Sequence, residues 1–352
     1  MPDADIYMID LAWPVASIPP WNKGMRIRDA LAKSEHRLHR LQRCASTIVM
    51  KGANYYVDGG LDRASHLRTN ETWVASQLCA DRTRFIPIWK TRNLVANQSE
   101  PRGVILTKAR ARHLLDISNT KVLLGLRNKV AYFAIDISEF EKQEMEDLHE
   151  NSEFVDLRSV GAVMERSEAS ILAYAKGIIY WHSRHLHCGV CGSPTESRDA
   201  GHLRKCLNRD CGASHFPRTD PAVIMLVSKG DRALLGRKAE WVEGMYSTLA
   251  GFVEPGESLE QAVAREVFEE SGVKISNIRY HSSQPWPFPA SLMLGFFADA
   301  LTENLVRSEE ELEDLRWFTR QELADGGAGI ARRPRSDSIA RQLIDEWIRM
   351  GD

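Results

Sequence analysis

The sequence predicts an α/β protein in which mixed sheets are covered by helices, and three observations support this class. First, the N-terminal half contains strand-like apolar runs at 84–89, 102–107, 121–126 and 130–136. Second, a helical pattern follows from Ser167 to about Ser183. Third, strand-like runs at 222–227 and 232–237, then residues 246–250, lead into a loop and a helix at 251–273. At 352 residues the chain is long enough for two or three domains.

The composition is that of an ordinary globular protein, with 43% hydrophobic residues, 27% charged residues and a net charge of −2. A nearly neutral chain has no overall basic field, so charge alone does not indicate non-specific binding of nucleic acid. No apolar run approaches the length of a membrane span, and the start of the chain does not resemble a secretory signal. We therefore expect a cytoplasmic protein. Residues 1–55 are interpreted as an N-terminal extension of unknown role.

Four of the six cysteines lie in one short window, in two pairs: Cys188, Cys191, Cys206 and Cys211. Two such pairs on facing turns can complete a tetrahedral zinc site with no open position, which is a structural arrangement. Unrelated buried thiols are the alternative. Because four thiolates fill the coordination shell, we expect the nearby histidines, among them His182 and His215, to be packing or surface residues.

The loop and helix at 251–273 carry the densest group of carboxylates. Ser258 precedes Gln261 by three residues, which is the spacing of a capping box, and Gly272 can end the helix in the left-handed conformation. On this helix the apolar stripe is expected at 262, 263, 267 and 268. The carboxylates of Glu266, Glu269 and Glu270 then project to one side. A cluster of oxygen ligands suits Mg²⁺ or Mn²⁺, whereas a solvated acidic helix face is the ordinary alternative.

The complete pattern of this stretch resembles the Nudix box: Gly251, Glu257, Arg265-Glu266, Glu269-Glu270 and Gly272 stand at the expected positions. Nudix hydrolases cleave nucleoside diphosphates linked to another group. The resemblance implies that Glu266, Glu269 and Glu270 bind a catalytic divalent metal, and that Glu270 helps to activate water. It also implies that Arg265 and Glu257 hold the loop and the helix together.

Sequences outside the box resemble one branch of this family, the NudC-type NADH pyrophosphatases. The segment 283–291, SQPWPFPAS, matches the signature of that branch, and the runs LDRASHLR at 61–68 and FAID at 133–136 match its N-terminal domain. The implied fold is a Nudix mixed sheet sandwiched by helices, preceded by a Nudix-like domain and a zinc ribbon. The expected boundaries are 1–55 for the extension, 56–183 for the Nudix-like domain, 184–216 for the ribbon and 217–352 for the catalytic domain.

The same resemblance implies further site residues. Glu311, by its distance from Trp317-Phe318, matches a metal-binding glutamate outside the box, with Glu310 as the alternative. Residues at positions that contact substrate in the family are Phe216, Phe252, Ala250, Gln284, Trp286, Phe288, Ser291 and Ala340. The family also implies a homodimer.

These features predict an NAD(+)/NADH diphosphatase that cleaves NAD(H) to NMN(H) and AMP with Mg²⁺ or Mn²⁺, and that also removes NAD caps from RNA 5′ ends. A Nudix hydrolase of another dinucleotide, such as ADP-ribose or a diadenosine polyphosphate, is one alternative. A non-catalytic Nudix protein that senses NAD metabolites is another. The SQPWPFP segment argues against the first alternative, and the complete box argues against the second.

Overall fold

The structure is a computed structural model that describes residues 54–57, 59–141, 145, 148–326 and 332–351. The expected N-terminal extension lies outside the described residues, except for Asn54 and Tyr55. Residues Ala53–Asp352 belong to one unit, which contains three sheets. None of the helices formed by the described residues has the length and apolar character needed to span a bilayer.

The first sheet has seven strands, with β3, β2, β1, β6 and β5 in order and with β4 and β7 paired to β1 and β2. Its strands β1 and β6 are parallel. The elements of this region are α2 (Glu71–Cys79), β1 (Arg84–Trp89), β2 (Arg92–Ala96), β3 (Arg102–Gly103), β4 (Leu106–Thr107), α3 (Lys108–Ile117), β5 (Lys121–Arg127), β6 (Val130–Asp136), β7 (Ser152–Val155), α4 (Leu157–Val160) and α5 (Arg166–Arg184). The run expected as one strand at 102–107 is therefore two short strands.

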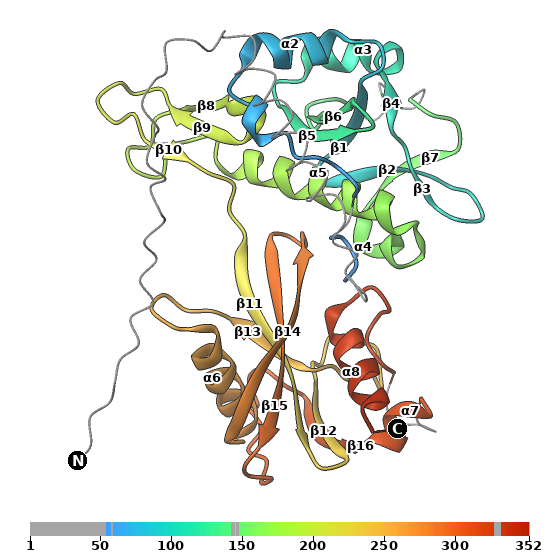
Figure 1. Cartoon of the computed structure of the whole chain (residues 1–352), viewed down its shortest axis with the longest axis vertical. Helices are drawn as coiled ribbons and strands as arrows, with labels where there is room; N and C mark the ends of the chain where they lie inside the picture. Colours follow the sequence, from blue (N-terminus) through green and yellow to red (C-terminus); the bar gives the residue numbers. More distant parts are fainter. Residues whose placement is uncertain (1–53, 58, 142–144, 146–147, 327–331, 352) are drawn as a thin grey trace, which may run out of the picture. The chain divides into compact units, whose positions relative to one another are not determined.

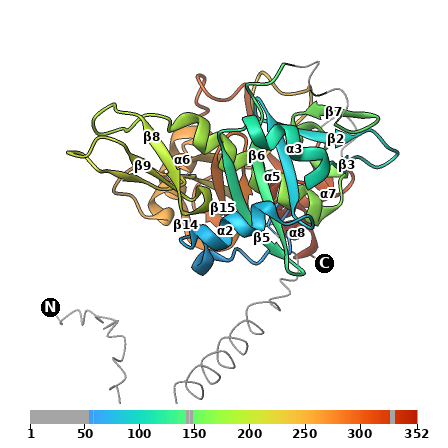
Figure 2. The ribbon, with the colours of Figure 1, turned by 90° about the horizontal axis from the view of Figure 1, so that it is seen from above.

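Successive residues of these strands face opposite sides of the sheet, as the strand period of two requires. Ile86 packs with the apolar side chains of α5 in one core, whereas Phe85 packs with Leu114 of α3 in another. Both are fully buried. Figure 1 and Figure 2 show the two helices near this sheet. The alternation therefore produces a sheet with a helix on each face.

A three-stranded sheet, in the order β10, β9, β8, carries the cysteine pairs. Its strands are β8 (Thr195–Arg198), β9 (Leu203–Cys206) and β10 (Ser214–His215). Arg204 of β9 is buried and donates hydrogen bonds to Thr195, and its Nη1 lies 3.0 Å from Nδ1 of His182 on α5. His182 is buried and its Nε2 lies 2.8 Å from the carbonyl oxygen of Gly201. The ribbon is therefore packed onto α5, and His182 is a packing residue as expected.

The third sheet has six strands, with β14, β15, β11, β12 and β16 in order and with β13 paired to β11. Strands β11 and β15 are parallel, and the other pairs are antiparallel. The elements are β11 (Asp220–Lys229), β12 (Arg232–Arg237), β13 (Leu249–Phe252), α6 (Leu259–Ser271), β14 (Ile275–Trp286), β15 (Ser291–Ala300), β16 (Asp314–Thr319), α7 (Arg320–Ala324) and α8 (Ile339–Arg349). The expected mixed sheet between helices is confirmed.

The residues of β11 show how this sheet is sandwiched. Val223 and Met225 pack with the buried side chains of α6, whereas Ile224 and Leu226 pack with those of α8. In Figure 1 the two helices lie on opposite sides of the sheet. This arrangement brings the acidic helix α6 and the N-terminus of α8 to the strands that carry the site.

Candidate functional site: an acidic helix beside a cavity

Local sequence determines both ends of α6. Ser258 accepts a hydrogen bond from the backbone N–H of Gln261, and the Gln261 side chain accepts one from the backbone N–H of Ser258. Gly272 ends the helix with φ 69° and donates its N–H to the carbonyl of Phe268. The expected capping box and glycine cap are both confirmed, so the register of the acidic residues on α6 follows from the chain itself.

The buried face of α6 differs from the expected stripe at one position. Ala262, Val263 and Val267 are fully buried, but Phe268 is 53% exposed, so its predicted place in the stripe is wrong. Glu270, which is 2% exposed, lies on the buried side instead. At 100° per residue, position 268 is turned away from the face that 263, 267 and 270 share. The helix therefore buries carboxylates where an ordinary amphipathic helix buries apolar side chains.

Glu270 is the most deeply buried acid of the box. Burial, followed by the charges of Glu266 and Glu311, raises the pKa of Glu270 to about 8. Its Oε2 is buried and has no hydrogen-bond partner among the described residues. Burial also raises the pKa of Glu266, which is 8% exposed. A buried carboxylate oxygen without a partner costs free energy, and a hard cation bound there would remove that cost.

Arg265 links the outer carboxylates of the box. Its Nε donates to Glu257 at 2.6 Å, and its Nη1 donates to Glu266 at 2.8 Å and to Glu269 at 2.9 Å. Its Nη2 donates to the backbone carbonyl of Phe252 in β13. The structural roles expected for Arg265 and Glu257 are thus confirmed, because one guanidinium ties the loop, the strand and the helix together.

Gly251 is required by the close approach of β13 to α6. A Cβ atom at this position would lie 1.8 Å from Cδ of Glu266 and about as close to both carboxylate oxygens of that residue. The strand therefore passes directly against a metal-ligating candidate. Any side chain at 251 would displace the carboxylate of Glu266 from its place.

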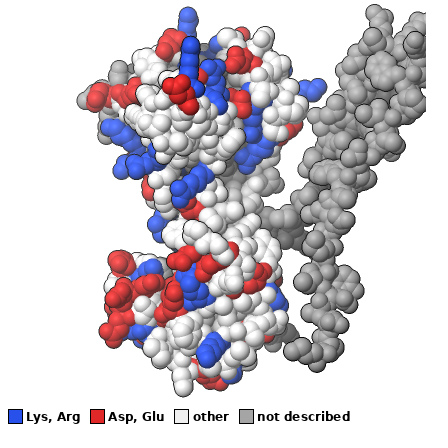
Figure 3. Space-filling model, turned by 90° about the vertical axis from the view of Figure 1, so that its left-hand side faces the viewer, with Lys and Arg blue, Asp and Glu red and all other residues white. Residues whose placement is uncertain are grey.

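Glu311 approaches the helix from a separate loop. The backbone N–H of Ser308 donates to the carbonyl of Glu270, and that of Glu311 donates to the carbonyl of Ser308. The charge of Glu311 is among the causes that raise the pKa of both Glu266 and Glu270, which places it near both. The side chain is exposed. Figure 3 shows acidic side chains gathered on the face that includes α6.

The carboxylates of Glu266, Glu269, Glu270 and Glu311 lie near one another, but their oxygen atoms do not meet at one point. Among the described residues, the group of potential metal ligands that meets at one point is the four cysteines. The buried Oε2 of Glu270 and the oxygen-rich chemistry of the set nevertheless fit a divalent cation such as Mg²⁺ or Mn²⁺. Divalent metal catalysis is what the Nudix fold of this domain implies.

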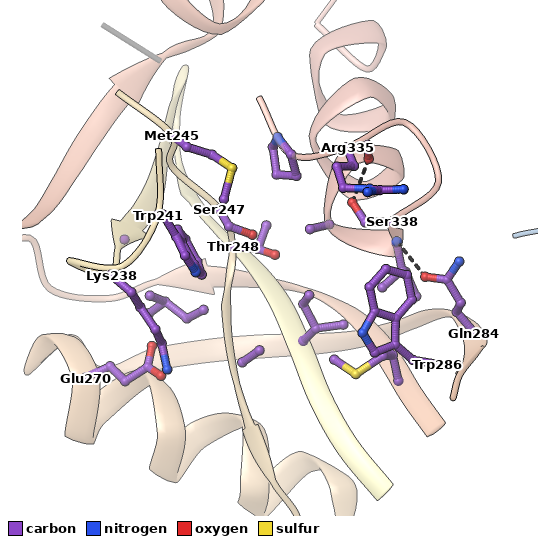
Figure 4. Close-up of a pocket in the computed structure, with 18 of the residues that line it drawn as sticks. Lys238, Trp241, Met245, Ser247, Thr248, Glu270, Gln284, Trp286, Arg335 and Ser338 are labelled. Carbon is purple, nitrogen blue, oxygen red and sulfur yellow. Dashed lines mark hydrogen bonds between the residues drawn. The ribbon is translucent and has the colours of Figure 1, made fainter. Parts of the chain in front are cut away.

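A cavity of about 430 Å³ opens beside Glu270. Besides Glu270, four residues that were expected at the site line this cavity: Ala250, Gln284, Trp286 and Ala340. The sequence did not point to its remaining polar and aromatic walls, which include Lys238, Trp241, Arg158 and Arg335. Figure 4 shows Lys238 and Trp241 on the same side as Glu270, with Trp286, Gln284 and Arg335 opposite them. The cavity thus places basic side chains and flat rings next to the acidic helix.

Gln284 is buried, and its amide is fully engaged with backbone groups. It donates to the carbonyls of Tyr55 and Asp337, and it accepts from the backbone N–H of Ile339 at the start of α8 (Figure 4). The side chain therefore fixes the entry to α8, where Ala340 lines the cavity.

The other residues expected to contact substrate do not line this cavity. Phe216 and Phe252 are 68% and 59% exposed. Ser291 opens β15 opposite Trp286 of β14. Phe288 packs edge-on against Trp286 and lines a separate, smaller cavity.

The four cysteines do converge. Their sulfur atoms all lie within 4.8 Å of one another, with 3.8 Å between Cys188 and Cys211 and 3.5 Å between Cys191 and Cys206. Tetrahedral zinc with Zn–S bonds of about 2.3 Å requires sulfur atoms about 3.8 Å apart. The cluster therefore fits structural zinc. His215 was expected to be a packing or surface residue. It contacts the cysteine cluster, because its Nε2 lies 3.2 Å from the sulfur of Cys188.

Comparison with known families agrees with this organisation. The NUDIX domain family matches residues 218–339. The NADH pyrophosphatase-like rudimentary NUDIX domain matches residues 82–181, and the NADH pyrophosphatase zinc ribbon domain matches residues 183–216. The chain is thus a Nudix protein with a second, rudimentary Nudix domain and a zinc ribbon.

Three relatives cover large parts of the chain. The NAD-capped RNA hydrolase NUDT12 of Macaca fascicularis is 35% identical over 340 residues, which span 84% of this chain and 74% of the relative. The NAD-capped RNA hydrolase NudC of Mycobacterium bovis is 39% identical over 271 residues, or 70% of this chain and 86% of the relative. The NAD-capped RNA hydrolase NudC of Stutzerimonas stutzeri is 47% identical over 178 residues, which span 51% of this chain and 61% of the relative. The chain belongs to the NudC-type NADH pyrophosphatase branch of the Nudix family.

Proposed function

We propose that this protein hydrolyses the pyrophosphate bond of NAD(H) to NMN(H) and AMP, and that it removes NAD caps from RNA 5′ ends by the same cleavage. Water supplies the oxygen that bonds to one phosphorus, the bridging P–O bond breaks, and the released phosphate oxygen leaves as part of a phosphomonoester. The observation that carries the proposal is the buried, unpartnered Oε2 of Glu270 at the edge of a cavity with basic and aromatic walls.

The carboxylates have distinct parts in this proposal. Glu266, Glu269, Glu270 and Glu311 hold Mg²⁺ or Mn²⁺, which when bound supplies positive charge to the phosphate oxygens and lowers the pKa of a bound water. Glu270 helps to orient the attacking water and to accept its proton, because it is the carboxylate that lines the cavity. Lys238 provides positive charge for the phosphates on the wall beside Glu270, and Arg335, whose guanidinium is paired with the buried Asp337, offers its remaining N–H donors on the opposite wall.

The substrate contacts follow from where the side chains lie. Phe216 and Phe252 are exposed rings that can stack on a base, and Trp286 walls the cavity. Ala250 and Ala340, which line the cavity, contact the dinucleotide in this proposal. Gln284 acts indirectly, by positioning the start of α8. We also propose that Ser291, at the start of β15, lies beside the substrate. Phe288 lines the separate, smaller cavity.

The domain division that we propose is 56–183, 184–216 and 217–352, following an extension at 1–55. The ribbon has a structural role, with zinc held by its four cysteines. We also propose a homodimer that acts in the cytoplasm, which rests on the family resemblance and on the reduced cysteine cluster.

The test offers the purified protein NADH, NAD, ADP-ribose and NAD-capped RNA with Mg²⁺ or Mn²⁺. We expect NMN or NMNH from NAD(H) and from the capped RNA, and loss of at least about 100-fold in kcat for Glu270→Gln. Glu260→Gln is the matched control, since Glu260 lies on the same helix but is exposed in its first turn.

Three outcomes contradict parts of the proposal. Absence of NMN from both NAD(H) and capped RNA refutes the function. Preferential cleavage of ADP-ribose indicates a hydrolase for another dinucleotide. Tight binding of NAD without turnover by the metal-loaded protein indicates a sensor.

A further inference from the structure

A second cavity, of about 240 Å³, lies next to the one that contains Glu270. Its walls come from the turn before β2, from the start of α4, from α5 and from the tip of the β14–β15 hairpin. The lining residues are Thr91, Asp156, Arg158, Lys176, Tyr180, Phe288 and Pro289. Arg158 lines this cavity and also the larger one. Arg158 is therefore a wall that the two cavities share.

The second cavity contains two cations and one acid. Lys176 is 6% exposed, and its ammonium group donates to the carbonyl of Thr91 at 2.7 Å and to Asp156 at 3.1 Å. An ammonium group has three N–H donors, so these two bonds leave one N–H for a ligand. Arg158 is exposed, and its guanidinium forms no hydrogen bond or ion pair with the residues that the structure describes. With two cations and one acid, the second cavity carries a net positive charge, and Arg158 lines both cavities.

Aromatic rings complete the second cavity. Phe288 lies with its ring 5.4 Å from the Lys176 ammonium, and Tyr180 lines the same space from α5. Phe288 also packs against Trp286, a wall of the larger cavity. Ring faces next to cations are the combination that binds single-stranded nucleic acid, where bases stack and phosphates pair with basic side chains.

We propose that the second cavity binds the first nucleotide after the NAD cap, with Arg158 on the phosphodiester that joins it to the cap adenosine. Lys176 adds charge, and Phe288 and Tyr180 contact the base. This inference rests on the proposed function and deepens it. Free NAD(H) lacks that phosphodiester, so the cavity contributes to capped RNA and not to the free dinucleotide.

The experiment compares Arg158→Ala with the wild-type full-length protein on three substrates: NADH, NAD extended by a single nucleotide at its adenosine 3′ oxygen, and a short NAD-capped RNA. For Arg158→Ala we expect kcat/KM to fall at least about tenfold more on both extended substrates than on NADH, as for loss of one phosphate contact. The slope of log KM against log salt concentration for capped RNA should flatten by about one. Arg110→Ala is the matched control, because Arg110 is exposed on α3 and lines neither of these cavities.

Other outcomes overturn the inference. An equal loss on NADH and on the extended substrates means that Arg158 binds the dinucleotide itself. Unchanged kinetics on all three mean that the second cavity is not used. A wild-type enzyme that cleaves NADH but neither extended substrate overturns this inference and leaves the hydrolase intact, whereas a wild-type protein that cleaves none of them refutes the proposed function as well.

Discussion

Glu270→Gln is expected to make the metal-free protein more stable while it abolishes activity. The pKa of Glu270 is raised from 4.5 to about 8 by burial, so in the folded protein the carboxyl stays protonated over a range in which the unfolded chain has lost the proton. Because the unfolded state then binds fewer protons, the free energy of unfolding falls as pH rises. Below pH 4.5 the group carries no penalty, and above pH 8 the penalty is complete.

The magnitude follows from the size of the shift. One unit of pKa corresponds to about 1.4 kcal/mol, so between about pH 5.5 and 7.5 the wild type should lose about 2.7 kcal/mol relative to Glu270→Gln. Urea unfolding of both proteins at several pH values, without Mg²⁺ or Mn²⁺ and with zinc retained, measures this difference. Adding Mn²⁺ should restore stability to the wild type and not to the variant.

Glu269→Gln is the matched control, because the Glu269 side chain is 54% exposed and a solvated carboxylate has little burial penalty. A stability difference for Glu270→Gln that is constant from pH 5.5 to 7.5 would refute the burial argument.

Three further changes test other contacts. Gly251→Ala, which puts a methyl group on the carboxylate of Glu266, should reduce kcat about 100-fold and weaken Mn²⁺ binding in a calorimetric titration; unchanged Mn²⁺ affinity would contradict this. Cys191→Ser should remove the bound zinc and destabilise the fold, as measured by metal analysis and thermal unfolding; full retention of zinc would refute the cluster. Tyr56→Phe should cost about 1–3 kcal/mol in urea unfolding, because it removes the donor to buried Asp337; an unchanged midpoint would show that the bond contributes nothing.

The features that sequence predicted well are local ones. The capping box at Ser258 and the glycine cap at Gly272 depend on residues a few positions apart, and both form. The strand expected at 84–89 also has the bounds of β1. In each case the chemistry that favours the conformation lies within one short segment, so tertiary packing does not have to be known.

Features that depend on distant segments were missed. The cavity joins Lys238 after β12, Trp241 in the following loop and Arg335 before α8, and no motif links these positions. The exposed position of Phe268 was missed for a related reason, since hydrophobicity predicted an apolar stripe. The buried face of α6 instead includes the carboxylate of Glu270. The burial of this acid follows from the fold and from metal binding, and hydrophobicity along the helix does not predict it.

The distribution of positive charge explains why the site needs a cation from solution. Arg265 pairs with Glu257, Glu266 and Glu269 but not with Glu270, and no described residue donates a hydrogen bond to the buried Oε2 of Glu270. Lys238 lowers the pKa of Glu270 through its charge, yet burial dominates and the net shift is upward. The protein therefore pairs the outer acids with its own arginine and leaves Oε2 of the innermost acid without a donor. Since an ionised Glu270 is stabilised only when a cation binds, metal binding, ionisation of Glu270 and stability of the catalytic domain are coupled, and each should shift the other two.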